Sequence, residues 1–179
     1  MTTRMIFAGF GGQGVMLMGQ IISLASMIEG KNVTWMPSYG PEMRGGTANC
    51  TVVVSDEPVA SPVTDKAEVV VAMNIPSLLK FEPYVVENGY LFLNQSVIDR
   101  ESKRNDINVL KIPCNEIADE IGNLKVANMV MLGAVVGATN VVSTESIFKA
   151  IEKKLSGGKT ALIEVNKQAI MRGYELAKK

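Results

Sequence analysis

The stretch Met5-Ile6-Phe7-Ala8-Gly9-Phe10-Gly11-Gly12-Gln13-Gly14-Val15 decides how the rest of the chain is interpreted. A short apolar run, typical of a buried strand, enters a glycine-rich turn and continues as an apolar helix over 15–28. Gly9, Gly11 and Gly14 satisfy the pattern G-x-G-x-x-G between a strand and a helix, where they would serve the tight turn, backbone approach and helix–strand packing respectively. Free N–H groups at the start of such a helix suit a phosphate or carboxylate. The residues alone leave two interpretations open, an anion or cofactor site and tight backbone packing.

A nicotinamide-binding fold also needs an acidic residue at the end of its second strand, where it holds the ribose hydroxyls. Here the second strand is predicted over 32–36, and the chain continues as Pro37-Ser38-Tyr39-Gly40 with no acid among these residues. Glu29 lies near the expected count but comes before that strand, at the other end of the sheet. The sequence therefore argues against NAD as the ligand of the glycine turn.

The length of the chain indicates a single globular domain that spans residues 1–179. The chain is 47% hydrophobic and 20% charged, which is apolar-rich, and its 18 basic and 18 acidic residues cancel. A neutral surface gives no electrostatic reason to bind nucleic acid or an anionic membrane. It also lacks the self-repulsion that keeps proteins apart, as is typical of a subunit in a larger assembly.

The reactive side chains are few. The sequence contains no histidine, which excludes the usual catalytic triads. Cys50 and Cys114 are far apart, show no metal-binding spacing, and are expected to be free buried thiols in a reducing cytoplasm. No secretory signal is evident at the start. The uncharged run over 126–142 is shorter than the ~20 residues of a membrane span and is predicted to be a buried helix.

Strand and helix patterns alternate along the chain. This alternation predicts a single Rossmann-like, three-layer α/β domain with a mostly parallel sheet and helices on both faces. A turn is expected at Asn88-Gly89, and a short helix is expected to start at 74–76. The remaining strands are predicted over 47–55, 68–73, 90–93 and 107–112, and the remaining helices over 115–121, 127–138, 144–155 and 161–177.

The second chemically suggestive segment runs from Tyr39 to Gly46. It leaves the carboxyl end of a strand, so we expect it in the same crevice as the glycine turn. Arg44 could hold a carboxylate or phosphate with its two-pronged donors, Glu42 could pair with it or accept a proton, and Tyr39 could stack or donate. The alternative is a rigid surface loop with solvated charges, and composition leaves both open. Nothing in the sequence assembles a nucleophile, a base and an orienting group.

Taken together, Gly9-Phe10-Gly11-Gly12-Gln13-Gly14 and Ser38-Tyr39-Gly40-Pro41-Glu42-Met43-Arg44-Gly45-Gly46 resemble the gamma subunit of 2-oxoacid:ferredoxin oxidoreductases. The chain looks most like the 2-oxoglutarate branch of this pyruvate/ketoisovalerate oxidoreductase gamma family. The resemblance covers essentially the whole chain, and its second motif is much more specific than its first.

The resemblance implies a role within a complex that converts a 2-oxoacid and coenzyme A to acyl-CoA and CO2 and passes electrons to ferredoxin. It implies that alpha and beta subunits carry thiamine diphosphate with Mg2+, and that iron–sulfur clusters sit on cysteine-rich parts such as a ferredoxin-like delta subunit. This chain would bind no cofactor alone and would not be active alone. The alternative function is a free-standing Rossmann oxidoreductase that binds NAD or FAD.

The resemblance also implies that the two motifs face the alpha and beta subunits near the route of coenzyme A, with Arg44 paired to a partner carboxylate or an anionic group of coenzyme A. No residue is expected to be catalytic or to bind a metal. The residues expected to contact a ligand or partner are Gly9, Gly11, Gly12, Gln13, Gly14, Ser38, Tyr39, Gly40, Pro41, Glu42, Arg44, Gly45 and Gly46.

Overall fold

The computed structural model describes residues 1–39, 47–158 and 160–179, and these residues contain a six-stranded sheet with strand order β2-β3-β1-β4-β5-β6. The strands β1, β4, β5 and β6 pair in parallel, whereas β3 is antiparallel to both β1 and β2. The predicted mostly parallel sheet is therefore confirmed. The strands are β1 (Thr2–Phe10), β2 (Asn32–Tyr39), β3 (Thr47–Ser55), β4 (Ala67–Ala72), β5 (Val85–Asn94) and β6 (Asn108–Ile112).

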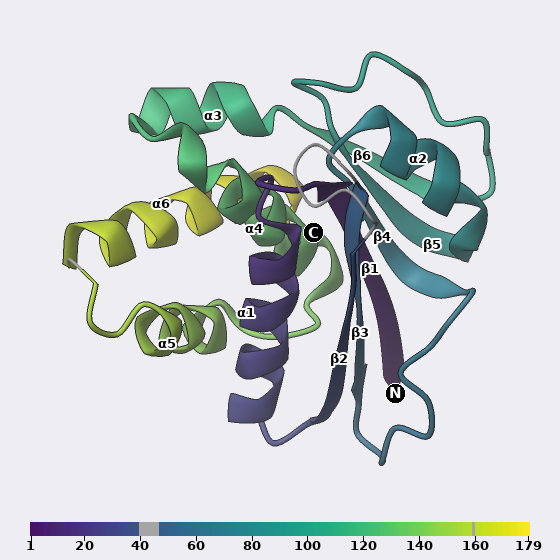
Figure 1. Cartoon of the computed structure of the whole chain (residues 1–179), viewed down its shortest axis with the longest axis horizontal. Helices are drawn as coiled ribbons and strands as arrows, with labels where there is room; N and C mark the ends of the chain where they lie inside the picture. Colours follow the sequence, from purple (N-terminus) through teal and green to yellow (C-terminus); the bar gives the residue numbers. More distant parts are fainter. Residues whose placement is uncertain (40–46, 159) are drawn as a thin grey trace.

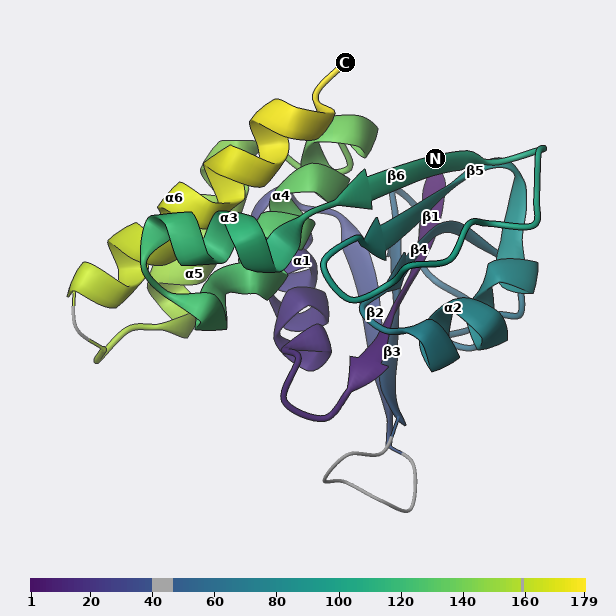
Figure 2. The same ribbon diagram turned by 90° about the horizontal axis from the view of Figure 1, so that it is seen from above.

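Helices cover both faces of the sheet, as predicted (Figure 1). Most of them lie on one side, and α2 (Ile75–Phe81) lies on the other, as the view from above shows (Figure 2). The larger layer consists of α1 (Val15–Ile28), α3 (Cys114–Ile121), α4 (Ala127–Thr139), α5 (Thr144–Lys154) and α6 (Thr160–Ala177). Two short 3-10 helices, η1 (Glu82–Tyr84) and η2 (Leu124–Val126), precede β5 and α4.

Strand β1 is buried on both faces, which explains its continuous apolar sequence. Met5 and Phe7 belong to the large core beneath α1, whereas Ile6 and Ala8 belong to the smaller core beneath α2. Successive side chains of a strand point to opposite faces, so one short run supplies both cores. The nearly all-apolar helix α1 is covered on its outer side by α5.

The uncharged run predicted to be a buried helix forms α4, in which every residue from Asn128 to Ala138 is buried. No helix in the described part of the chain is long and apolar enough to cross a membrane. Helix α6 packs directly on α4 through glycines. A Cβ atom on Gly173 would lie 1.8 Å from the carbonyl oxygen of Val130, and one on Gly133 would lie 2.0 Å from that of Ile170.

Both cysteines are free and buried, as predicted. Burial raises the pKa of the Cys50 thiol to about 12, and burial also raises the pKa of the Cys114 thiol. Neither thiol is a thiolate near neutral pH, and both act as small apolar core groups.

Two predicted boundaries are corrected by the structure. Strand β2 does not end at Met36 but continues to Tyr39, because β2 lies at the edge of the sheet, where a proline such as Pro37 is tolerated. The Asn88-Gly89 pair does not precede a strand but lies within β5, where Asn88 has φ 62° and the pairing with β4 shifts register between Ala67 and Val69. The left-handed residue therefore marks a bulge.

Candidate functional site

The glycine turn connects the end of β1 to the start of α1. Gly12 has φ 93° and Gly14, at the helix N-cap, has φ 75°, so these two positions provide the left-handed turn. Gly9 has a different role from the one its motif position suggests, because it is still paired with Ala48 inside the sheet. A Cβ atom on Gly9 would lie 2.7 Å from Gln13 Oε1, and one on Gly14 would lie 2.3 Å from Asn128 Nδ2.

Gln13 closes this turn with its own side chain. Its Oε1 accepts a hydrogen bond from the Phe10 N–H at 2.7 Å, and its Nε2 donates to the carbonyl of Met73 at 2.9 Å. The Asn74 side chain, which caps α2, donates to the same Oε1 at 3.3 Å. The turn therefore already has an internal acceptor on the N–H that follows Gly9, and a bound phosphate would compete with it.

Gln13 lies at the point where the sheet changes winding direction. Strand β1 leads to α1 on one face, and its parallel neighbour β4 leads to α2 on the other (Figure 2). Open α/β sheets bind ligands in the crevice outside the carboxyl ends of such neighbouring strands. The sequence thus placed the glycine turn at the correct end of the sheet for a ligand.

The second motif begins at this same end. Ser38 is exposed near the end of β2, and the backbone of Tyr39 pairs with Ala48. Thr47, the first residue of β3, pairs with Phe10 beside the glycine turn. The residues that flank the loop are thus brought next to the turn. The predicted contact residues Gly40, Pro41, Glu42, Arg44, Gly45 and Gly46 lie outside the described residues.

A pocket of about 180 Å³ lies beside Gly12 and Gln13. Its walls come from the carboxyl ends of β4 and β5 and from the first residues of α3 and α4. The lining residues are Gly12, Gln13, Met73, Asn94, Asn115, Leu124, Lys125, Ala127 and Asn128. Sequence reasoning missed Asn94, Asn115, Lys125 and Asn128, because they are dispersed along the chain. The available signal was an isolated Asn ending or interrupting an apolar run, as in Asn94 and Asn128.

Amide groups dominate the polar part of this pocket. Asn94 is 1% exposed, donates to Asn115 Oδ1 at 3.2 Å and accepts from the Ser96 N–H at 3.3 Å. Asn128 is 6% exposed and donates from Nδ2 to the Gly14 carbonyl at 3.3 Å. Within the described residues, Asn128 Oδ1 takes part in no hydrogen bond.

This lining can bind a polar or anionic group but offers little for bond making. Amides supply both donors and acceptors, and Lys125 is the charged side chain among the lining residues. Among residues 1–39, 47–158 and 160–179, no group of three His, Cys, Asp or Glu side chains could hold a metal ion. The geometry supports binding and orientation of a ligand.

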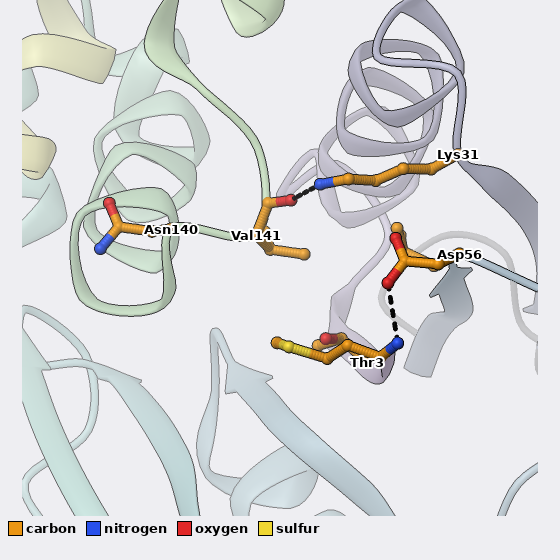
Figure 3. Close-up of a pocket in the computed structure, with 7 residues that line it drawn as sticks. Thr3, Lys31, Asp56, Asn140 and Val141 are labelled. Atoms are coloured by element: carbon orange, nitrogen blue, oxygen red, sulfur yellow. Dashed lines mark hydrogen bonds and ion pairs between the residues drawn. The ribbon is translucent and has the colours of Figure 1, made fainter.

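A second pocket, of about 150 Å³, lies at the opposite end of the sheet (Figure 3). Its charged groups bond to one another or to the backbone: Lys31 Nζ donates to the Val141 carbonyl at 2.6 Å, and the Met1 ammonium lies 2.7 Å from Asp56 Oδ2. This internal pairing leaves the amide-lined pocket as the better candidate for a ligand.

Comparison with known proteins identifies the family. The model of the pyruvate ferredoxin/flavodoxin oxidoreductase family matches residues 4–176. The chain is 37% identical over 174 residues to the 2-oxoglutarate synthase subunit KorC of Methanocaldococcus jannaschii, covering 96% of this chain and 91% of that protein. The crystal structure of a keto/oxoacid ferredoxin oxidoreductase gamma subunit from Geobacter sulfurreducens has a TM-score of 0.84 and 29% identity, with 98% of each chain covered.

Another relative carries the same domain within a longer chain. The ketoisovalerate oxidoreductase subunit VorA of Methanothermobacter marburgensis is 38% identical over 176 residues, which cover 98% of this chain but 37% of VorA. The chain thus spans little more than a third of that relative. The match over nearly all of its own length shows that the chain belongs to the pyruvate ferredoxin/flavodoxin oxidoreductase family.

Proposed function

We propose that this chain, as a single gamma-type domain over residues 1–179, is the gamma subunit of a multi-subunit 2-oxoacid:ferredoxin oxidoreductase. The complex converts a 2-oxoacid and coenzyme A to acyl-CoA, CO2 and reduced ferredoxin in the cytoplasm. The observation that carries this proposal is the nearly end-to-end match with KorC, a separate subunit of similar length. The same match favours 2-oxoglutarate as the substrate.

In this proposal the reaction is catalysed by cofactors on other subunits and not by this chain. Alpha and beta subunits supply thiamine diphosphate and Mg2+, and iron–sulfur clusters on cysteine-rich parts, including a ferredoxin-like delta subunit, carry electrons to ferredoxin. The amide-lined pocket supports this division, because its groups can hold and orient a ligand but supply no activated nucleophile. Gly9, Gly11, Gly12, Gln13 and Gly14 would line the face turned toward the partners.

We propose that the pocket receives one polar group of coenzyme A. Its volume of about 180 Å³ suits a phosphate or a short amide segment rather than the whole molecule. Lys125 would attract an anionic group, and Asn128 Oδ1 would accept a hydrogen bond from an amide N–H. The loop with Glu42 and Arg44 would close over the same edge, with Arg44 paired to a partner carboxylate or an anionic group of coenzyme A.

The alternative of an oxidoreductase that binds NAD or FAD has no support in this geometry. Strand β2 ends at Tyr39 with no acidic residue for a ribose, and the Gln13 side chain occupies the Phe10 N–H inside the turn. Glu29, which lies near the expected residue count after the glycine turn, caps the far end of α1.

The proposal is tested by reconstitution. The chain is co-expressed with the thiamine-binding pair and the ferredoxin-like chain, and coenzyme A-dependent reduction of ferredoxin is measured with 2-oxoglutarate, pyruvate and ketoisovalerate in parallel. Co-purification of all chains and fastest turnover with 2-oxoglutarate are expected. Failure of the chain to associate with the thiamine-binding pair would overturn the assignment as a gamma subunit.

Replacement of Arg44 by Ala tests the loop in the same complex. An Arg buried in a paired contact leaves its partner charge unpaired when it is truncated, which costs about 2–5 kcal/mol. We expect weaker assembly or a higher KM for coenzyme A. An Arg44→Ala complex that assembles and turns over like the unmodified complex would remove Arg44 from the site.

A further inference from the structure

Half of one sheet face is left without a helix. Helix α2 packs on β1 and β4, and no helix in the described part of the chain packs on the same side of β2 and β3 (Figure 2). Val33, Trp35, Cys50 and Val52 point into the core beneath α1, so the residues between them point outward. We call this surface the open face; it consists of Phe10, Thr34, Met36, Ser38, Thr47, Asn49 and Thr51.

Four of the seven residues of the open face are exposed, the other three are half-buried, and none of the seven carries a charge. The charged Arg4, on the same side of β1, pairs with the buried Val53 and lies outside the open face. Met36 is 41% exposed and Phe10 is 36% exposed, and Ser38 and Thr47 are also exposed. All seven residues are uncharged, although 20% of the chain is charged. Depletion of charged residues, more than hydrophobicity as such, distinguishes the centre of a protein–protein interface from ordinary surface.

The two edge strands of the sheet, β6 and β2, also differ in charge. Strand β6 is short and carries Lys111, whose ammonium bonds to Glu101. Strand β2 is 8 residues long and contains no charged residue, so Pro37 is its main protection against pairing with another strand. Free sheet edges are usually guarded by charges. The unguarded edge is the one that borders the open face.

The lengths of the relatives indicate which kind of partner this domain has to bind. The domain is a separate chain in KorC and the Geobacter gamma subunit but little more than a third of VorA. A covalent link supplies a high effective concentration for domain docking. A separate chain has no such link and needs a surface that holds its partner directly.

We propose that the open face, together with the β2 edge, docks the subunit of the complex that corresponds to the remaining length of VorA. This inference rests on the proposed function and names the surface that serves it. The docking surface of that subunit would also be uncharged, because a charge buried against the open face would be left unpaired. Because Phe10 and Thr47 lie at both the open face and the glycine turn, docking here brings that subunit to the rim of the amide-lined pocket.

The test places charges on the open face of the full chain within its own complex. The double variant Met36→Lys/Thr51→Lys introduces two ammonium groups at outward-facing strand positions. Its matched control is Leu79→Lys, on the exposed side of α2, where Leu79 is 50% exposed. Circular dichroism and thermal unfolding verify that each variant is folded, and binding to the co-expressed subunits is measured by titration at low and high salt.

We expect the double variant to bind at least about tenfold more weakly than the unmodified chain, with Leu79→Lys unchanged. The weakening caused by the double variant should persist at high salt, because it comes from burying unpaired charges and not from losing a solvent-exposed ion pair. If the unmodified chain binds and the folded double variant binds equally well, the open face is not the docking surface, while the proposed function survives. If the unmodified chain binds none of the subunits, the proposed function itself fails. If sedimentation shows that the unmodified chain self-associates and the double variant does not, a second copy occupies the face and this inference is wrong.

Discussion

Helix α4 contributes to two regions of the molecule, a close-packed contact with α6 and the amide-lined pocket, and these depend on different interactions. Its first turn presents Asn128 to the amide-lined pocket, and its middle presents Gly133 and Gly137 to α6. The α6 contact depends on shape, because missing side chains let the two backbones approach. The pocket depends on directional hydrogen bonds and retains an amide oxygen with no partner among the described residues. Stability and ligand binding should therefore respond to different substitutions, although one helix carries both.

The largest effect on the free energy of unfolding should come from the close-packed contact between α4 and α6. Gly173→Ala adds a Cβ atom 1.8 Å from the carbonyl oxygen of Val130. Replacing a mid-helix glycine by alanine normally gains about 1 kcal/mol, but overpacking against backbone should cost about 3 kcal/mol or more. We expect a net loss in urea unfolding. The control is Gly157→Ala, which has φ 93° but nothing within 4 Å and should cost about 1 kcal/mol from strain alone. A Gly173→Ala protein of normal stability would show that the helix pair tolerates separation.

A substitution in the glycine turn beside the pocket should have a smaller effect on stability. Gln13→Ala removes the acceptor of the Phe10 N–H and the donor to the Met73 carbonyl. Two partly exposed hydrogen bonds together contribute about 1–2 kcal/mol. Thermal unfolding should show that loss, whereas Gln20→Ala on α1 should leave stability nearly unchanged. Equal stability of the two variants would mean that the glycines alone hold the turn.

The Glu29 carboxylate, which links the end of α1 to the start of α5, should make stability depend on pH. Burial disfavours ionisation of Glu29, but the Ser143 N–H at 2.7 Å and the Lys31 ammonium at 3.0 Å outweigh it and lower the pKa of this carboxyl from 4.5 to about 2. A depressed folded-state pKa stabilises the folded protein above pH 4.5, and this contribution is lost as the pH falls toward 2.

After screening by solvent, the contribution of Glu29 should be about 1 kcal/mol. Glu29→Gln should lower stability near neutral pH and flatten its decline in acid, as measured by urea unfolding at a series of pH values. Parallel pH profiles for the variant and the unmodified chain would contradict the assigned pairing.

The smallest effect on stability should come from the pocket's charged side chain. Lys125 is exposed, so Lys125→Ala should change unfolding by no more than about 0.5 kcal/mol. In the reconstituted complex it should raise the KM for coenzyme A several-fold while kcat changes little. Lys66→Ala, an exposed lysine at the other end of the sheet, is the control. A KM equal to that of the control would remove Lys125 from the coenzyme A path.

Much of the fold was predictable because its signals are local. Helix α1 and strand β3 have the predicted bounds, since glycine turns delimit the first and a β-branched run marks the second. The prediction ended β2 before Pro37, because a proline disfavours a central strand and the sequence does not reveal that β2 lies at an edge. Asn88-Gly89 indicated a turn, yet a bulge satisfies the same left-handed backbone within β5.

The candidate site was predictable only in part. The glycine turn is contiguous in sequence, and its position follows from the strand before it. Asn94, Asn115 and Asn128 meet only because β5, α3 and α4 end or begin at one edge of the sheet, and no spacing in the sequence encodes that meeting. The closing role of Gln13 depends in the same way on Met73 and Asn74, which are distant in the chain.

The most direct measurement compares the isolated chain with the reconstituted complex in one assay. With 2-oxoglutarate, coenzyme A and ferredoxin, the complex should turn over and the chain alone should not. Adding NAD in place of ferredoxin should not rescue the isolated chain. Turnover by the purified chain with substrate and a nicotinamide alone would contradict the proposal that it provides shape and a binding edge for chemistry carried out on its partners.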